Sequence, residues 1–211
     1  CDNLGIETIW ANDIKPDACG VYRYRFSSEE IVEGDIGALK TEIPSSYDIL
    51  TAGFPCQPFS SAGKKLGVED TRGTLFREIH EIIQVTKPKA FLLENVKRLL
   101  SMQKGEAFKI ILSTLSKLDY SIEWRLVNCR SFGIPQNRER VFIAGIRNDC
   151  VNGDPILRLK DEDEDILKPA TNLVLHKGRF NTWGSVSDGL LHEHNYPSKV
   201  AEYGDTKLLD I

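Results

Sequence analysis

Residues 48–63 have the sequence Asp-Ile-Leu-Thr-Ala-Gly-Phe-Pro-Cys-Gln-Pro-Phe-Ser-Ser-Ala-Gly. The first six residues predict a buried strand, and the rest predict a loop rich in glycine, proline and serine. In open α/β sheets, ligands and catalytic groups lie just beyond the carboxyl ends of the strands. This stretch therefore predicts both a layered fold and a functional site at one edge of its sheet.

Cys56 is the reactive residue of this loop, and a proline lies on each side of it, at positions 55 and 58. Each proline fixes its own φ and restrains the residue before it. Such a stiff backbone suits a nucleophile that must keep one attack geometry. A loop cysteine can equally be a small packed apolar residue, and local chemistry alone leaves both interpretations open.

Elsewhere in the chain, short apolar runs alternate with segments of helical period, which is typical of helices packed on a sheet. The predicted strands cover residues 7–12, 48–53, 90–93, 122–128 and 140–146, and the predicted helices include residues 18–26, 76–83 and 108–118. We expect the last two strands to be antiparallel neighbours. The pattern predicts an α/β fold with a mostly parallel sheet, and it places His80 in the core.

The composition of the 211-residue chain, 41% hydrophobic and 27% charged, is typical of a globular domain. It excludes disordered, collagen-like and coiled-coil classes. No apolar run approaches the roughly 18 residues that a membrane-spanning helix needs. The first residues show neither a signal peptide nor Met, so we expect a processed, trimmed or partial chain.

The net charge of −4 argues against a strongly basic nucleic-acid-binding protein. The acidic run at residues 161–165, expected to be a solvated loop, accounts for this excess, so the remainder can hold local basic patches. The five cysteines form no C-x-x-C pair, which favours reduced, intracellular thiols. No histidine has metal-ligand spacing to a cysteine, so we expect no metal site.

The character of the sequence changes near residue 150, which predicts a domain boundary. Residues 1–150 contain the periodic segments, whereas residues 151–211 are rich in Gly, Asp, Asn and Lys and lose the periodicity. We therefore expect one layered domain over residues 1–150, followed by a linker or the start of another region.

Further polar groups lie at predicted strand ends. Glu94-Asn95 follows the apolar run 90–93, where a partly desolvated carboxyl group suits a proton donor; a helix cap is the alternative. Gln-x-Arg-x-Arg at residues 136–140 alternates three donors onto one face of an extended stretch, which suits a base edge or a phosphate, or a solvated strand edge. Acids at strand tips, such as Asp13 and Asp35, commonly bind ribose hydroxyls.

Four of these pieces together resemble one family. Pro55–Ser60, Asp70–Phe76, Glu94–Val96 and the Gln-x-Arg-x-Arg motif at 136–140 have the order and spacing of the DNA cytosine-5 methyltransferases. The resemblance extends from about residue 4 to about residue 147. It implies a Rossmann-like methyltransferase fold that uses S-adenosylmethionine.

The resemblance implies a covalent mechanism on cytosine. Cys56 matches the nucleophile that adds to C6, and its surroundings must favour the thiolate. Glu94 matches the residue that bonds N3 and the exocyclic amine, and Arg140 matches the contact to O2. Arg138 supports the pocket, and Asn95 orients the loop of the nucleophile.

The same resemblance implies that the cytosine leaves the DNA duplex, because its ring carbons are out of reach inside the base stack. Residues 57–72 resemble the family's mobile catalytic loop, whose cations can pair with phosphates. The implied contacts of this loop to double-stranded DNA are Gln57, Ser60, Lys64, Lys65 and Arg72.

For the cofactor, the resemblance implies five contacts. Asp13 matches the acid that binds the ribose, Ile14 the contact to the adenine ring, and Asp35 the acceptor of the adenine amine. Pro55 and Leu75 match positions that line the same pocket.

The chain departs from the family pattern in lacking the first strand with its glycine-rich turn and the terminal motifs. We therefore expect little activity from these 211 residues alone, and residues 151–211 to begin a target-recognition region. The resemblance also implies a restriction-modification enzyme of the bacterial cytoplasm, monomeric at full length.

Two alternatives stay open. A transfer-RNA cytosine methyltransferase would share the fold, although the Cys-Phe-Thr signature of that branch is absent. A non-catalytic or split subunit, binding DNA or a complementing polypeptide, would have no chemical need for Cys56, Glu94 and Arg140 together.

Overall fold

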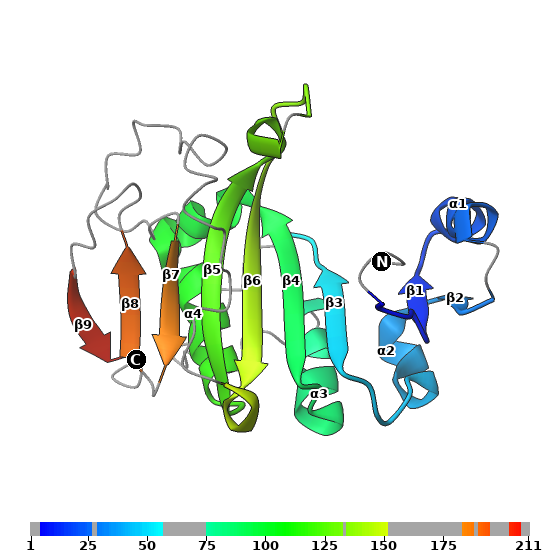
Figure 1. Cartoon of the computed structure of the whole chain (residues 1–211), viewed down its shortest axis with the longest axis horizontal. Helices are drawn as coiled ribbons and strands as arrows, with labels where there is room; N and C mark the ends of the chain where they lie inside the picture. The colour runs from blue at the N-terminus through cyan, green and yellow to red at the C-terminus, as the bar shows by residue number, and fades with distance from the viewer. Residues whose placement is uncertain are drawn as a thin grey trace. The chain divides into compact units, whose positions relative to one another are not determined.

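The computed structural model describes residues 5–26, 29–56, 75–132, 134–151, 183–187, 190–194 and 203–207. They belong to two compact units that meet in the sequence between Tyr47 and Asp48 (Figure 1). Each unit contains its own sheet, and each is described by itself. None of the described helices is long and apolar enough to cross a membrane.

The first unit is a small parallel β-α-β arrangement. Its elements are β1 (Ala11–Asp13), α1 (Pro16–Phe26), β2 (Ile31–Glu33), α2 (Ile36–Leu39) and a 3₁₀ turn, η2 (Lys40–Glu42). β1 and β2 pair in parallel, so that Asp13 lies opposite Glu33. The Asn12 amide holds the turn after β2, since it donates to the carbonyls of Val32 and Gly34.

The second unit contains a mixed sheet with the strand order β3-β4-β6-β5-β7-β8-β9. The strands are β3 (Ile49–Gly53), β4 (Ala90–Val96), β5 (Tyr120–Asn128), β6 (Glu139–Arg147), β7 (Trp183–Ser187), β8 (Leu190–His194) and β9 (Tyr203–Lys207). The helices are α3 (Leu75–Thr86) and α4 (Glu106–Ser116), with 3₁₀ segments η4 (Lys97–Gly105), η5 (Cys129–Phe132) and η6 (Asn148–Cys150).

The predicted α/β fold is confirmed, and so is the antiparallel pairing of β5 with β6. The share of parallel strands is smaller than expected. Among the described strands, only β1–β2 and β3–β4 are parallel, whereas β4–β6, β5–β6, β5–β7, β7–β8 and β8–β9 are antiparallel. The sequence could not show this, because an apolar run predicts a buried strand but not the direction of its neighbour.

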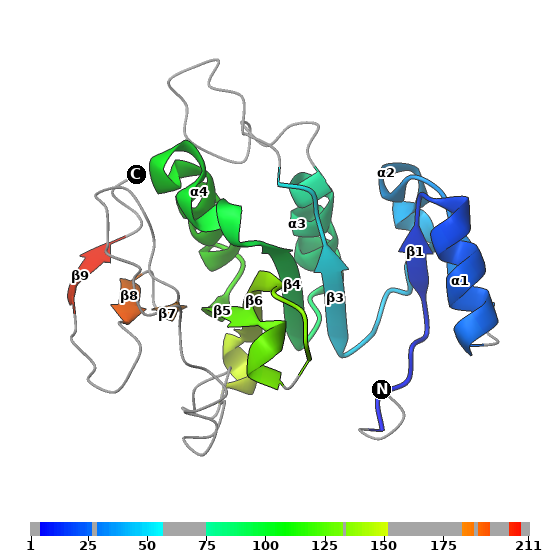
Figure 2. The ribbon, with the colours of Figure 1, turned by 90° about the horizontal axis from the view of Figure 1, so that it is seen from above.

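The core of the second unit lies between the sheet and α3 and α4, which cover one of its faces (Figure 2). The T-shaped pair of Phe108 and Trp124, with ring centroids 5.3 Å apart, joins α4 to β5. The ring of Phe91 lies directly against Gly145 of the neighbouring strand, where a Cβ atom would come within 2.2 Å of it. His80 is buried in α3, as predicted.

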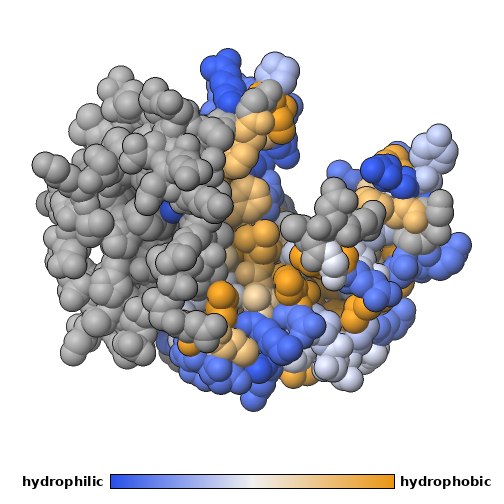
Figure 3. Space-filling view, in the orientation of Figure 1, coloured by the Kyte–Doolittle hydropathy of each residue, from blue (hydrophilic) through white to orange (hydrophobic). Residues whose placement is uncertain are grey.

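The other face of the sheet has apolar side chains along its central strands (Figure 3). Side-chain alternation places Leu92 of β4 with Phe142 and Ile146 of β6 on this face, and all three are half-buried. The polar groups of β4 and β6 are therefore confined to the two ends of these strands.

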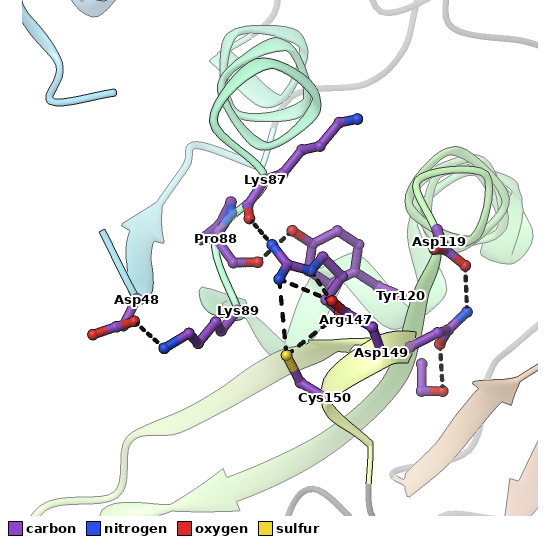
Figure 4. Close-up of polar contacts among 11 residues, drawn as sticks. Asp48, Lys87, Pro88, Lys89, Asp119, Tyr120, Arg147, Asp149 and Cys150 are labelled. Atoms are coloured by element: carbon purple, nitrogen blue, oxygen red, sulfur yellow. Dashed lines mark hydrogen bonds and ion pairs between the residues drawn. The ribbon is translucent and has the colours of Figure 1, made fainter. Parts of the chain in front are cut away.

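One end of β6 is fastened to the turn before β4 by Arg147 (Figure 4). Its guanidinium donates to the carbonyl of Lys87 and to both carboxylate oxygens of Asp149. The Tyr120 hydroxyl donates to the buried carbonyl of Pro88 at 2.6 Å. Lys87 has a φ of 47°, a left-handed conformation, so these bonds hold a turn that the backbone alone disfavours.

The turn between α4 and β5 is fastened at the same end. Asn148 donates from its backbone to the carbonyl of Asp119 and from its amide to the Asp119 carboxylate. The Ser121 hydroxyl donates to the Asn148 amide oxygen. This end of the sheet is therefore closed by hydrogen bonds of residues 147–149, and the candidate residues Glu94 and Arg140 lie toward the opposite end.

Candidate functional site

Cys56 lies three residues beyond β3, on a segment that is anchored from the neighbouring strand. The Asn95 side chain, only 1% exposed, donates a buried hydrogen bond of 2.8 Å to the carbonyl of Phe54. The oxygen of the same Asn95 side-chain amide accepts a hydrogen bond from the backbone N–H of Val96. Asn95 therefore connects the end of β4 to the backbone that leads into Pro55 and Cys56.

The Cys56 side chain is half-buried and packs against the hydrophobic core. Burial raises the pKa of the Cys56 thiol above its ordinary value, because a thiolate loses hydration there. The positive charge of Arg98 opposes this rise. The environment thus contains one cation that favours the reactive thiolate form.

Glu94 and Arg140 form an ion pair between β4 and β6, with Arg140 Nε and Glu94 Oε1 2.6 Å apart. Val96 pairs with Arg140 in the sheet, and Glu94 pairs with Phe142. Glu94 and Arg140 are therefore diagonal neighbours on one face, where side chains can meet. The two side chains are 36% and 22% exposed, so solvent reaches the carboxylate while the guanidinium is mostly covered.

The Glu94 carboxylate also lies beside the strand that precedes Cys56. Gly53 pairs with Glu94, and a Cβ atom at Gly53 would lie 3.6 Å from Glu94 Oε2. One carboxylate oxygen is thus directed to Arg140 and the other to the end of β3. Three neighbouring strands deliver a thiol, a carboxylate and a guanidinium to one end of the sheet.

A second ion pair lies beside the first. Lys97 Nζ donates to both carboxylate oxygens of Glu139, at 2.7 and 2.8 Å. Arg140 Nη1 donates to the Glu139 carbonyl at 2.9 Å. Lys97, Arg98 and Glu139 were not selected from the sequence. The available signal was position, because Lys97 and Arg98 directly follow the Glu94–Val96 motif and Glu139 lies inside the motif at residues 136–140.

The Gln-x-Arg-x-Arg motif is not one extended row. β6 begins at Glu139, and the backbone N–H of Arg138 donates to the carbonyl of Gln136, which bends the chain. Gln136 and Arg138 are exposed. The expected alternation of three donors on one face is therefore wrong: of the three, only Arg140 lies in the strand.

In the first unit, Asp13 ends β1 and Asp35 lies two residues beyond β2, at the same end of the two parallel strands. Asp13 Oδ1 accepts from the backbone of Lys15 at 2.8 Å. Asp35 Oδ1 accepts from Gly37 at 2.7 Å and caps α2. The side chain of Ile14 is 62% exposed, so it is available as an apolar contact surface.

The remaining predicted positions have mixed outcomes. Leu75 begins α3 and packs against the core, and Pro55 is exposed. The expected DNA contacts lie outside the described residues: Gln57, Ser60, Lys64, Lys65 and Arg72. In the part of the chain that is described, no three His, Cys, Asp or Glu side chains could hold a metal ion together.

The atoms of Glu94 and Arg140 that make no hydrogen bond indicate which kind of ligand the site could bind. Among the described residues, Arg140 Nη2 has no hydrogen-bond partner, and neither has Glu94 Oε2. One donor and one acceptor of the ion pair therefore remain without a partner among the described residues, at the end of the sheet where β3 leads into the Cys56 segment. Such a set suits a planar polar ring that offers an acceptor next to a donor, with an electrophilic carbon within reach of sulfur.

Comparison with known proteins supplies an independent finding. The family model described as C-5 cytosine-specific DNA methylase matches residues 1–200. The chain is 49% identical over 147 residues to the type II methyltransferase M1.ScrFI of Lactococcus lactis subsp. cremoris, covering 70% of this chain and 37% of that protein. It is 45% identical over 148 residues to M.NgoBI of Neisseria gonorrhoeae, covering 70% and 46%. It thus spans less than half the length of these relatives.

Solved structures agree on the fold. S. pombe Dnmt2 matches with a TM-score of 0.55 and 20% identity, over 83% of this chain and 51% of that one. A mutant of Spodoptera frugiperda DNMT2 matches with a TM-score of 0.54 and 23% identity, over 76% and 48%. At this level of identity the likeness concerns the arrangement of helices and strands alone.

Proposed function

The chain belongs to the C-5 cytosine-specific DNA methylase family, and from this premise we propose that it methylates C5 of a cytosine flipped out of duplex DNA. The observation that supports this most strongly is the 2.6 Å pair of Glu94 and Arg140 beside the anchored segment of Cys56. Among the described residues, the pair leaves one acceptor and one donor without a partner, and the Watson–Crick edge of cytosine offers an amine and the O2 acceptor.

Cys56 is the proposed nucleophile. Its thiolate adds to C6, and electron density moves to C5, a carbon that is otherwise a poor nucleophile. Glu94 bonds the exocyclic amine and N3 and supplies a proton to N3 as the sulfur attacks, while Arg140 holds O2. Once C5 carries the methyl group, water takes the C5 proton, N3 returns its proton to Glu94, and the C6–S bond breaks to release the Cys56 thiolate and restore the aromatic ring.

The residues present also fit the proposed cofactor, S-adenosylmethionine, which supplies an electrophilic methyl group when bound. Asp13 and Asp35 each use Oδ1 in a local backbone hydrogen bond, and each keeps Oδ2 without a partner among the described residues. Free carboxylate oxygens after parallel strands suit ribose hydroxyls and an adenine amine. Exposed Ile14 offers an apolar surface to the adenine ring, and Pro55 and Leu75 are proposed to line the pocket.

The remaining roles belong to the same proposal. Arg138 supports the cytosine pocket, and Asn95 orients the Cys56 segment through Phe54. Cations of residues 57–72 contact DNA phosphates. Residues 1–150 form the catalytic region and residues 151–211 begin target recognition. The proposal includes a monomeric enzyme of the bacterial cytoplasm that acts with a restriction system; the similarity to type II methyltransferases supports the last part alone.

Substitution of Cys56 tests this function. In the natural-length polypeptide, Cys56→Ala should abolish transfer of a radiolabelled methyl group to duplex DNA while DNA binding persists, because only the covalent step needs the sulfur. Retained turnover in Cys56→Ala would contradict the nucleophile assignment. Transfer RNA as a parallel substrate tests the RNA alternative, and DNA binding without any turnover in the unsubstituted protein would favour a non-catalytic or split subunit.

A further inference from the structure

The second ion pair, between Lys97 and Glu139, has no part in the proposed chemistry and yet lies beside the site. The Lys97 ammonium bonds both Glu139 oxygens, at 2.7 and 2.8 Å, and the side chains are 29% and 27% exposed. Exposed ion pairs contribute little to stability on average. The Lys97–Glu139 contact uses both carboxylate oxygens and is mostly covered, so it holds the two side chains in place more firmly than an exposed pair would. Its position beside Arg140 indicates which group it could orient.

The two ion pairs hold β6 from opposite faces of the sheet, one from β4 and the other from the residue directly after it. Val96 pairs with Arg140, the residue after Val96 is Lys97, and the residue before Arg140 is Glu139. Because successive side chains of a strand point to opposite faces, Glu139 lies on the face opposite Arg140. Glu94–Arg140 therefore links β4 to β6 on one face, and Lys97, the first residue of η4, holds Glu139 of β6 on the other.

The connection between the two pairs is a single peptide group. Arg140 Nη1 donates at 2.9 Å to the carbonyl of Glu139, the residue whose side chain Lys97 holds. The guanidinium thus bonds the peptide group of the residue whose side chain is ion-paired with Lys97. Rotation of this peptide would move the Nη2 atom, which has no hydrogen-bond partner among the described residues.

We propose that Lys97 and Glu139 are positioning residues that set the Arg140 guanidinium against Glu94. The proposal rests on the proposed function, since it assigns the pair to alignment of the cytosine edge. Neither residue touches the base. Their contribution is to orient the Arg140 guanidinium. A displacement of a catalytic group by about 1 Å can lower the reaction rate by up to about 100-fold.

The test uses near-isosteric variants of the natural-length polypeptide. Lys97→Met and Glu139→Gln remove one charge each, and the double variant K97E/E139K restores the pair in reverse. Lys117→Met, at an exposed lysine that follows α4, is the matched control. We expect each single variant to lower kcat about tenfold with KM for duplex DNA within about twofold, and the double variant to recover most of the loss. The control should behave as the unsubstituted protein.

A second measurement does not depend on activity. Hydrogen exchange of the Arg140 Nε–H, followed by NMR, should accelerate several-fold in Lys97→Met and return toward the original rate in K97E/E139K. Unchanged exchange in Lys97→Met, or kcat within twofold in both single variants, would overturn the proposal. If the unsubstituted protein does not methylate DNA, the proposed function fails, and the exchange rates still show whether Lys97 positions Arg140.

Discussion

The two ends of β6 each have an arginine, and the two arginines use their nitrogens differently. At the far end, Arg147 Nε, Nη1 and Nη2 all bond acceptors, namely the Asp149 carboxylate and the Lys87 carbonyl. At the site end, Arg140 Nε bonds Glu94 and Nη1 bonds the Glu139 carbonyl, while Nη2 has no partner among the described residues. A guanidinium with all three nitrogens hydrogen-bonded closes a turn, whereas one with a nitrogen still unbonded can donate to a ligand.

The charges at the two ends support this distinction. The hydrogen bond from Arg147 lowers the pKa of Asp149, and the same bond raises the pKa of Arg147, so both groups stay ionised across the neutral range. At the site end, the half-buried Cys56 thiol has its pKa raised by burial. The far end therefore has charges that stay fixed, whereas the site end has a thiol that burial keeps protonated more readily than a free thiol.

The sharpest test of this comparison is the same substitution at both ends. Arg140→Lys should lower kcat/KM for DNA methylation by about 100-fold, because lysine cannot bond Glu94, a backbone carbonyl and a base edge from one planar fork. Arg147→Lys should leave kcat/KM within about twofold. Both are measured as initial rates with saturating cofactor. Equal losses in the two variants would show that both arginines act only through folding.

The buried bond of the far end should affect stability without affecting activity. Tyr120→Phe removes the hydroxyl that donates to the buried Pro88 carbonyl at 2.6 Å. We expect the free energy of unfolding to fall by about 1–2 kcal/mol, the cost of an unsatisfied buried carbonyl. Urea unfolding measures this loss, and methyl transfer at a temperature well below the transition should be unchanged. A rate loss at equal stability would link the far end to catalysis.

How far the sequence predicted the fold can be judged from β4 and β6. The apolar run at residues 90–93 was sufficient to predict a buried strand, and the structure extends it to Val96 through Glu94 and Asn95. The direction of β6 beside it was not predictable from either segment alone. Pairing direction depends on chain connections that periodicity does not contain.

The site shows the same limit at the level of single residues. Resemblance to a family selected Cys56, Glu94 and Arg140, and the structure brings Glu94 and Arg140 into direct contact. The row of Gln136, Arg138 and Arg140 was wrong because it assumed extended backbone before Glu139, where the chain turns. Lys97 and Glu139 were missed because they are 42 residues apart in sequence and meet only through strand register.

The smallest expected effect concerns Arg98, which neither contributes to the core nor belongs to a motif selected from the sequence. Its charge lowers the pKa of the Cys56 thiol against the larger effect of burial. Arg98→Gln should therefore raise that pKa further, reduce the thiolate fraction at pH 7 and slow alkylation by iodoacetamide about two- to fivefold.

The direction of the pH dependence makes the Arg98 prediction specific. Because the thiolate is the reacting form, the rise of the alkylation rate with pH should shift to higher pH in Arg98→Gln, and the two curves should converge once the thiol is fully ionised. Arg98→Lys keeps the charge and should follow the original curve. A uniform slowing at every pH would instead show that Arg98 controls access to the sulfur, and the site end would then lack the adjustable charge that distinguishes it from the far end.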